Sequence, residues 1–349
     1  MSRNFVCNLN PARIVFGTGR IAELADVVRA CGGSRAFVLS TPGRRGAAEA
    51  LAPALGDLFA GVFAGAREHT PVAVTQEAVA AFEEIGADCV VAMGGGSTIG
   101  LGKAIAYRTG CPQIALPTTY AGSEVTPILG QTEGGRKTTL RHPSVLPRAV
   151  IYDPDLSLGL PVPVSVTSGL NALAHAVEGS YARDSNPMMS MVAHEGARAL
   201  RDALPAIVAD PGSREARSEA LYGAWLCGTV LGSVGMALHH KLCHTLGGTF
   251  DLPHAQTHAI LLPHTSAYNA AGVPEAMAEL FGGAIGTGLW DFAQGLGAPL
   301  ALRDLGLRKD QIGQAADLAI EAPYWNPREL ERDGIRALLD RAWSGARPE

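Results

Sequence analysis

The sequence predicts an α/β nucleotide-binding domain followed by an all-helical domain, and three observations support this fold class. First, short apolar runs alternate with Ala-rich amphipathic stretches from about residue 12 to residue 153, which is typical of a mostly parallel sheet with crossover helices. Second, glycine-rich turns follow several of these runs. Third, the later sequence consists of long Ala/Leu/Glu/Arg helical stretches without a convincing strand. We therefore predict domains at residues 1–155 and 156–349, packed against each other with a cleft between them.

The strands of the first domain are predicted from their apolar residues and from the turns that follow them. The polar, Gly-containing segment from 130 to 141 is expected to form a surface hairpin, and Asp153-Pro154-Asp155 marks the end of the sheet-forming region. The predicted strands are Arg13–Phe16, Ala36–Ser40, Cys89–Met93, Gln113–Leu116 and Ala149–Asp153.

Composition excludes several classes of protein. The chain has 349 residues with 47% hydrophobic and 17% charged side chains, which indicates a folded globular protein rather than a disordered one. The net charge of -5 comes without a basic block, so neither nucleic acid nor an anionic membrane surface is an expected partner. The six cysteines include no CxxC pair, and no signal-peptide pattern or bilayer-length apolar window is found. We expect a cytoplasmic protein.

The first candidate cofactor site is the triple-glycine turn Gly94-Gly95-Gly96, which follows an apolar strand and opens a helix. Glycines without side chains let backbone N–H groups approach a pyrophosphate at a helix N-terminus, where the dipole favours negative charge. Ser97 is expected to cap this helix and to donate to a phosphate oxygen. The alternative is a tight strand-to-helix turn with no ligand.

Two further turns are predicted to contact the cofactor. Thr118, Thr119 and Ser123 form a hydroxyl cluster suited to phosphate or nicotinamide. Ser40 and Thr41 lie at the end of another predicted strand. Two arginines, Arg44 and Arg45, rather than a carboxylate come next, so a 2′-phosphate would be tolerated. The cofactor is therefore predicted to be NADH or NADPH.

The turn at Gly17-Thr18-Gly19 matches the dinucleotide fingerprint GxGxxG/A only superficially. A Rossmann site needs an acidic residue about 20 positions further on, and none is found there. We therefore do not assign this turn as the cofactor site.

Histidines in the second half of the chain form the clearest constellation. Asn171 and His175 are four residues apart on a predicted helix, as are His240 and His244, and His254 follows a loop. Imidazoles on adjacent helices build metal or proton-transfer sites, although a lone histidine is more often structural. Five other histidines show no comparable grouping and are expected to be structural, namely His258, His264, His194, His142 and His69.

The ordered motifs of the triple-glycine turn, the Thr-Thr turn and the histidine segments resemble those of the iron-containing alcohol dehydrogenases over nearly the whole chain. This resemblance implies a nucleotide-binding α/β domain, an all-helical domain and a divalent metal held by one Asp and three His. Residue by residue, the three histidine ligands correspond to His175, His240 and His254, and a nearby non-ligand histidine corresponds to His244.

Asn171 stands where that family has its metal-binding Asp. A neutral amide oxygen binds a hard Fe²⁺-like ion more weakly than a carboxylate. Together with Tyr120, with the Gly100-Leu101-Gly102 sequence that lacks an Asp, and with the segment 324–328, this departure resembles the maleylacetate reductase branch. That branch reduces maleylacetate to 3-oxoadipate in aromatic-compound degradation and is described as needing no metal. We expect no metal, but if one binds, its ligands would be Asn171, His175, His240 and His254.

The resemblance implies a conjugate reduction in which an enolate charge is stabilised without a Lewis acid. We expect His244 and His254 to act as electrophile and proton donor, with His175, His240 and Asn171 orienting the substrate or one another. Tyr324 is a further candidate proton donor or an aromatic wall. The dicarboxylate substrate needs cationic partners, and the candidates are Lys241, Arg328 and Arg136.

Two alternative functions are open from the sequence. The first is a metal-dependent alcohol or aldehyde oxidoreductase in which Asn171 still coordinates, and the second is a non-catalytic nucleotide-binding protein. The resemblance also suggests a homodimer.

Overall fold

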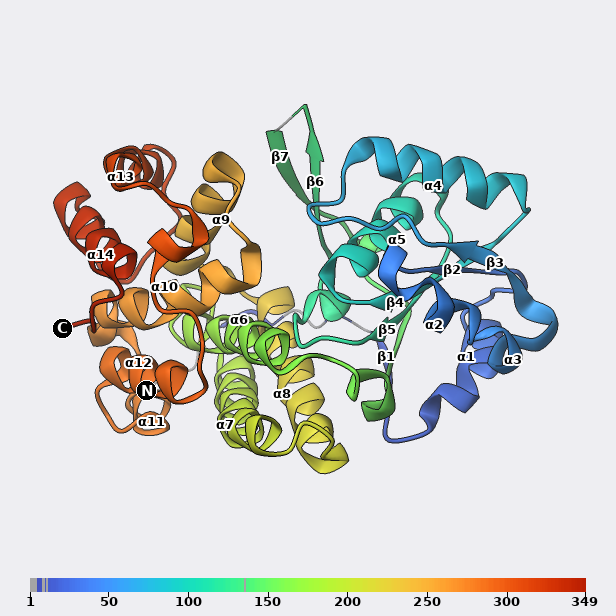
Figure 1. Ribbon diagram of the computed structural model, residues 1–349, viewed down its shortest axis with the longest axis horizontal. Helices are drawn as coiled ribbons and strands as arrows, with labels where there is room; N and C mark the ends of the chain where they lie inside the picture. The colour runs from blue at the N-terminus through green and yellow to red at the C-terminus, as the bar shows by residue number, and fades with distance from the viewer. Residues whose placement is uncertain (1–4, 8–9, 11, 135) are drawn as a thin grey trace. The chain divides into compact units, whose positions relative to one another are not determined.

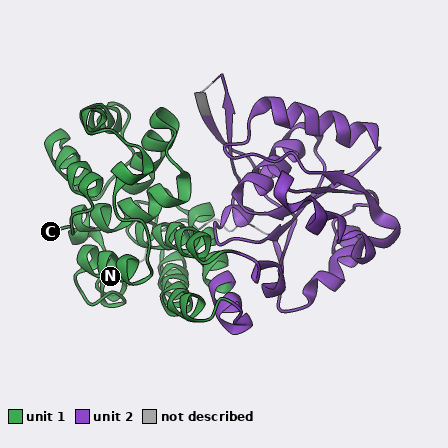
Figure 2. Cartoon of the chain, in the orientation of Figure 1, with its two compact units in different colours: residues 1–8, 161–211, 222–349 green, residues 9–160, 212–221 purple. Residues whose placement is uncertain are grey.

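The computed structural model describes residues 5–7, 10, 12–134 and 136–349, and the chain divides into two compact units. The α/β unit comprises residues 9–160 and 212–221, and the helical unit comprises residues 1–8, 161–211 and 222–349 (Figure 2). This architecture confirms the predicted fold class.

The α/β unit is built on a six-stranded, all-parallel sheet in the order β1-β8-β5-β4-β2-β3 (Figure 1). A separate antiparallel hairpin, β6–β7, covers the predicted hairpin segment. The strands are β1 Arg13–Phe16, β2 Ala36–Leu39, β3 Phe59–Phe63, β4 Cys89–Gly94, β5 Gln113–Pro117, β6 Ile128–Glu133, β7 Arg136–Arg141 and β8 Ala149–Tyr152.

Helices cover both faces of the sheet (Figure 1). Because successive strand residues point to opposite faces, Phe37 of β2 packs against Phe82 of α4, whereas Val38 joins the core formed with α1, α2 and α3. The helices of this unit are α1 Leu24–Ala30, α2 Arg45–Glu49, α3 Ala52–Leu55, α4 Val72–Glu84 and α5 Gly96–Thr109.

Burial on both faces explains why four strands read as continuous apolar runs. Every residue of β2, β4, β5 and β8 is buried. The edge strand β3 is only half-buried along its whole length, and Gly61 interrupts its apolar run, so its sequence does not predict a strand.

The helical unit contains no strand among its described residues. Its helix α6 is buried along almost its entire length and carries Asn171 and His175. Helix α8 crosses the division between the units at residue 221. The helices are α6 Val162–Ser180, α7 Pro187–Ala209, α8 Arg214–Ser233, α9 Leu238–Phe250, α10 His254–Tyr268, α11 Glu275–Glu279, α12 Ile285–Gly295, α13 Ile312–Glu321 and α14 Arg332–Ser344.

The division between the units lies five residues beyond the predicted boundary, and the start of α8 belongs to the α/β unit. Hydrogen bonds explain both differences. The guanidinium of Arg217, which is fully buried, donates to the Leu160 carbonyl at 2.9 Å and to the Tyr120 hydroxyl at 3.0 Å. Arg214 donates to the Asp155 carboxylate at 2.6 Å. The turn after β8 is therefore tied to the sheet unit.

Within the described part of the chain, no single helix has both the length and the apolar composition of a membrane span. Helices α8 and α9 pass that test only together, as a pair bent by 93°.

Candidate functional site

The three turns predicted to bind the cofactor emerge at one edge of the sheet. Strands β5, β4 and β2 are neighbours and parallel, so their carboxyl ends lie side by side. The turns after them begin at Thr118, Gly94 and Ser40, and the Thr118 N–H donates to the Gly94 carbonyl at 3.1 Å. Nucleotides bind at the carboxyl edge of such sheets, so this edge is the candidate cofactor site.

The three glycines of the central turn serve different purposes. Gly94 has a φ of 159°, and a Cβ there would lie 2.4 Å from the Thr98 Oγ1; a Cβ at Gly95 would lie 2.8 Å from the Thr119 Oγ1. A Cβ at Gly96 would meet nothing within 4 Å. Close packing thus explains the first two glycines, whereas Gly96 leaves the N-terminus of α5 open toward a ligand.

The prediction that Ser97 caps this helix is wrong. The N-cap is Gly95, and no side chain accepts a hydrogen bond there. Ser97 lies in the first turn of α5 and is half-buried. Because the N–H groups of this turn are not capped by a side chain, they remain suited to a phosphate.

The remaining cofactor candidates differ from one another in burial. Thr41, Thr119 and Ser123 are half-buried, and Thr118 is 7% exposed. Ser40 is fully buried, and its hydroxyl donates to the Thr41 carbonyl at 3.1 Å, so it supports the turn from inside.

The Gly17–Gly19 turn is closed by a carboxylate. Asp153 accepts hydrogen bonds from the N–H of Gly19 at 3.1 Å and of Ile21 at 2.9 Å. These are N–H groups that a pyrophosphate would need. This contact agrees with the prediction that the Gly17–Gly19 turn is not the cofactor site.

A buried ammonium group holds the Thr-Thr turn from below. Lys103 of α5 is fully buried, and its Nζ donates to the carbonyls of Ser123, Thr126 and Ile128 at 2.6 to 2.9 Å. Burial lowers the pKa of Lys103 to about 7, although the nearby Glu124 raises it. Glu124 is itself buried and accepts a hydrogen bond from the Tyr152 hydroxyl at 2.8 Å.

The histidine site is built within the helical unit by α6, α9 and α10. Asn171 and His175 lie on α6, His240 and His244 on α9, and His254 begins α10. The i,i+4 spacing brings each pair to one helix face.

A carboxylate and two imidazoles form a hydrogen-bonded chain at the centre of this site. Glu178 Oε2 lies 2.5 Å from His240 Nδ1, and His240 Nε2 lies 2.9 Å from His175 Nδ1. A carboxylate accepts, so His240 carries a proton on Nδ1, and its Nε2 is the nitrogen that faces His175 Nδ1. Glu178 also accepts from the backbone N–H of His239 at 2.7 Å. It therefore fixes the orientation of His240.

Tyr324 joins the site from the loop between α13 and α14. Its hydroxyl lies 3.0 Å from His244 Nδ1, and the rings of His244 and His254 lie parallel with centroids 6.4 Å apart. Burial, followed by the nearby Glu178 charge, raises the pKa of Tyr324. The phenol thus keeps its proton at neutral pH and can donate it.

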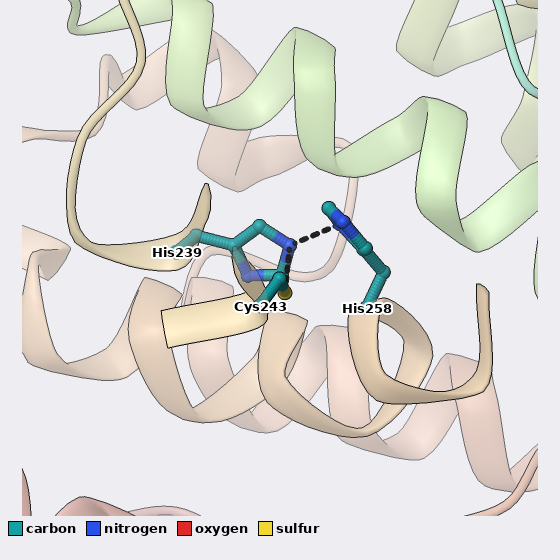
Figure 3. Close-up of side chains that lie close together, drawn as sticks. All are labelled: His239, Cys243 and His258. Carbon is teal, nitrogen blue, oxygen red and sulfur yellow. Dashed lines mark hydrogen bonds between the residues drawn. The ribbon is translucent and has the colours of Figure 1, made fainter. Parts of the chain in front are cut away.

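Two histidines outside the predicted set also belong to this cluster. The interpretation of His258 as an ungrouped structural residue is wrong, because its ring centroid lies 4.4 Å from that of His254 and 5.1 Å from that of His240. His258 Nδ1 lies 2.9 Å from His239 Nε2 (Figure 3). Desolvation, followed by neighbouring imidazoles, lowers the pKa of both His239 and His258 well below the usual value. Both are neutral rings.

Helical spacing in the sequence could have indicated two of the site residues that were not predicted, His258 and Glu178. His254 and His258 are four apart on α10, which is the spacing used to pair Asn171 with His175. Glu178 lies three residues after His175 and so shares its helix face. Nothing in the helical periodicity distinguishes His239, which lies next to His240.

The three predicted cationic partners of the substrate differ in position. Lys241 Nζ lies 6.0 Å from the centroid of the Tyr324 ring, beside the histidines. The Arg328 guanidinium lies over the Tyr268 ring at 4.1 Å, donates to the Tyr268 carbonyl, and lines a cavity of about 530 Å³ with residues 267–272 and Pro327. The side chain of Arg136 lies outside the described part of the structure.

The residues at the implied metal position do not fit a tightly held divalent ion. The buried Asn171 Oδ1 has no hydrogen-bond partner, which a metal could supply, but it is neutral. His175 and His240 hold the next two family positions, and Nδ1 of His175 lies 2.9 Å from Nε2 of His240. Among the described residues, His175, His240 and His254 do not form a group whose candidate ligand atoms all lie within 4.8 Å of one another. No anionic ligand offsets the ion's charge.

Comparison with known proteins extends the similarity over both units. A model of the iron-containing alcohol dehydrogenases matches residues 11–154, and one of the C-terminal part of the Fe-containing alcohol dehydrogenase family matches residues 165–343. A maleylacetate reductase of Rhizobium sp. strain MTP-10005 is 62% identical and one of Sphingobium indicum is 54% identical, each over 99% of both chains. The crystal structure of maleylacetate reductase from Agrobacterium tumefaciens, 60% identical, superposes with a TM-score of 0.96 over 99% of this chain and 100% of that one.

Proposed function

The chain belongs to the iron-containing alcohol dehydrogenase family, and from this premise we propose that it is a nicotinamide-dependent reductase that converts maleylacetate to 3-oxoadipate. The observation that carries the proposal is the imidazole cluster in which Asn171 replaces the acidic ligand of the family. Two maleylacetate reductases that match this chain over 99% of both lengths support the proposal. We propose NADH or NADPH as cofactor and no metal at the family position.

The chemistry needs stabilisation of a developing negative charge without a Lewis acid. The turns at Gly94–Gly96 and Thr118–Thr119 would hold the nicotinamide cofactor, which would supply a hydride for the alkene carbon β to the substrate ketone. The electron pair of the alkene then moves toward the ketone oxygen, which becomes an enolate. A proton added at the α carbon restores the ketone, so that only the carbon–carbon double bond is reduced. Hydrogen-bond donors at the oxygen lower the barrier of such a step.

The pair His244–Tyr324 is our candidate for the donor, because its contact holds a protonated phenol against an imidazole. His254, parallel to His244, is the second candidate. The chain Glu178–His240–His175 orients imidazoles and excludes water from the buried side of the site. Asn171 offers an amide for hydrogen bonding to the substrate.

The substrate has two carboxylates, and Lys241 is better placed than Arg328 to bind one of them. Lys241 lies beside Tyr324, whereas Arg328 is held on Tyr268 by stacking and a hydrogen bond. An ammonium beside the site provides a charge-assisted hydrogen bond for a carboxylate.

The test is a screen of NADH and NADPH oxidation with maleylacetate, simple aldehydes and simple ketones. We expect turnover with maleylacetate and a loss of about 100-fold or more in kcat for His244→Ala. Oxidation with an aldehyde but not with maleylacetate would overturn the substrate assignment. Absence of turnover with every substrate would favour a nucleotide-binding protein without chemistry.

The orphaned Asn171 Oδ1 favours a second candidate, a metal-dependent alcohol or aldehyde oxidoreductase. The variant Asn171→Asp separates the two. On our proposal it gains zinc or iron affinity at the family position and loses maleylacetate reduction, whereas a metal-dependent enzyme would become more active with metal.

We also propose that the protein works in the cytoplasm as a homodimer. Six cysteines without a CxxC pair support a reducing compartment, and the family resemblance supports the dimer. Light scattering of the purified full-length chain tests the oligomer, and a monomeric mass would contradict it.

A further inference from the structure

Three buried side chains beside the imidazole chain are not used by the proposed chemistry. They are His239 and Cys243, one turn apart on α9, and His258 on α10 (Figure 3). Their candidate ligand atoms all lie within 4.8 Å of one another, with His239 Nε2 2.9 Å from His258 Nδ1 and 3.6 Å from Cys243 Sγ. In the part of the chain that the structure describes, this is the one group of three His, Cys, Asp or Glu side chains with that geometry.

Thr265 fixes the tautomer of His239. The Thr265 hydroxyl donates to the Leu261 carbonyl at 2.9 Å, so it accepts from His239 Nδ1, which lies 2.9 Å away. His239 therefore carries its proton on Nδ1 and turns the lone pair of Nε2 toward His258 and Cys243. A hydrogen-bonded second partner of this kind is typical of metal-binding imidazoles.

The surroundings of the three side chains leave room for a metal in place of their hydrogen bond. Both imidazoles are fully buried, and Nε2 of His239 turns its lone pair toward the group. His258 Nδ1 donates to His239 Nε2 in this structure, so His258 binds a metal through Nδ1 once that proton moves to its Nε2. On the other side of the first turn of α9, the buried Glu178 carboxylate accepts from the backbone N–H of His239. A divalent ion with one thiolate has a net charge of +1, which this carboxylate partly offsets.

We propose that His239, Cys243 and His258 bind one Zn²⁺ ion, with Cys243 as a thiolate, at a site separate from Asn171, His175, His240 and His254. The thiol proton is released to solvent when the sulfur binds. Tetrahedral zinc with nitrogen at about 2.0–2.1 Å and sulfur at about 2.3 Å separates these ligands by roughly 3.3 to 3.6 Å. The observed 3.6 Å matches, and the two imidazoles need to part by a few tenths of an ångström.

The ion would join α9 to α10, the two helices that carry His240, His244 and His254. Imidazole and thiolate ligands favour zinc and cobalt over magnesium or calcium, and three protein ligands leave a fourth position for water. This site is independent of the identity of the substrate.

The experiment is a titration of the metal-depleted full-length protein with Co²⁺, which reports thiolate ligation by a near-ultraviolet charge-transfer band. We expect the band to saturate at one ion per chain and to be absent in Cys243→Ser. The matched control Cys227→Ser, which changes another fully buried cysteine on α8, should keep it. The folded variant His240→Ala should keep it too, because His240 is a family ligand position and not part of this site.

The proposal is overturned if wild-type protein shows no thiolate band, if the band survives in Cys243→Ser, or if it disappears in folded His240→Ala. Should Cys243→Ser fail to fold, X-ray absorption of the zinc-loaded wild-type protein decides. One sulfur and two imidazole nitrogens around zinc support the site, and a shell of nitrogen and oxygen alone contradicts it.

Discussion

The Nδ1 atom of His244 lies 3.0 Å from the hydroxyl oxygen of Tyr324, although 80 residues separate them in sequence. The loop that carries Tyr324 is held in place by a reciprocal amide pair, since Asn326 and Asn269 exchange two hydrogen bonds of 2.8 Å. The contact between imidazole and phenol therefore belongs to an anchored segment, and it places a proton donor at the site.

Removing either member of this pair should reduce chemistry more than binding. We expect Tyr324→Phe and His244→Ala each to lower kcat for maleylacetate reduction by about 100-fold or more, because general-acid groups contribute roughly 10²–10⁴. Steady-state kinetics with NADH measures both. Trp325→Phe, one residue along the same exposed loop, is the matched control and should leave kcat within about twofold. An equal loss of kcat in Tyr324→Phe and Trp325→Phe would show that the structure of the loop, and not the phenol, is what the reaction needs.

Lys241 and Arg328 should differ in their effect on substrate affinity. Lys241→Met is expected to raise the KM for maleylacetate by about 10-fold, because it removes a charge-assisted contact worth roughly 1.5 kcal/mol. Arg328→Met should leave KM unchanged and lower the melting temperature, because Arg328 stacks on Tyr268 at 4.1 Å. The reverse pattern would assign the carboxylate contact to Arg328.

Two glycine variants separate cofactor binding from folding. Gly96→Asp adds a side chain in open space at the start of α5, so we expect normal thermal stability and a KM for NADH raised by at least about 10-fold by charge repulsion. Gly94→Ala instead forces a Cβ to within 2.4 Å of Thr98 Oγ1 and should destabilise the fold by about 1–3 kcal/mol. Unchanged NADH kinetics in folded Gly96→Asp would argue against a pyrophosphate at this turn.

His264 should make the protein sensitive to acid. Burial lowers its pKa from 6.5 to about 4, so between these values the unfolded chain binds a proton that the folded chain does not. The free energy of unfolding therefore falls by about 1.4 kcal/mol per pH unit as pH decreases through this window. Urea unfolding at several pH values measures how the free energy of unfolding depends on pH. Between pH 4 and pH 6.5 this slope should be smaller by that amount in His264→Asn than in the wild-type protein. Above pH 7 the two slopes should be equal. An identical slope in both proteins would contradict this.

The sequence was most informative where burial is continuous. Strands such as Cys89–Gly94 and Gln113–Pro117 are buried on both faces, so each reads as a continuous apolar run that ends at a turn. Strand β3 at the sheet edge has no such pattern. The predicted family resemblance is confirmed by models that match both halves of the chain.

The site was predictable only to the level of helix faces. The pairs Asn171–His175 and His240–His244 follow from i,i+4 spacing. The contacts from His240 to Glu178 and to His175 depend on how α6 packs against α9, which local sequence does not specify. The burial of Ser40 and the closure of the Gly17–Gly19 turn by Asp153 are likewise tertiary effects.

The most direct test of the central claim is the rate of NADH oxidation with maleylacetate after exhaustive chelation, in wild-type protein and in Cys243→Ser. We predict that both proteins keep turning over, because hydrogen-bond donors beside Asn171 polarise the ketone without a metal. Loss of turnover in both proteins, restored by one equivalent of Fe²⁺ or Zn²⁺, would show that the family position still works through a metal.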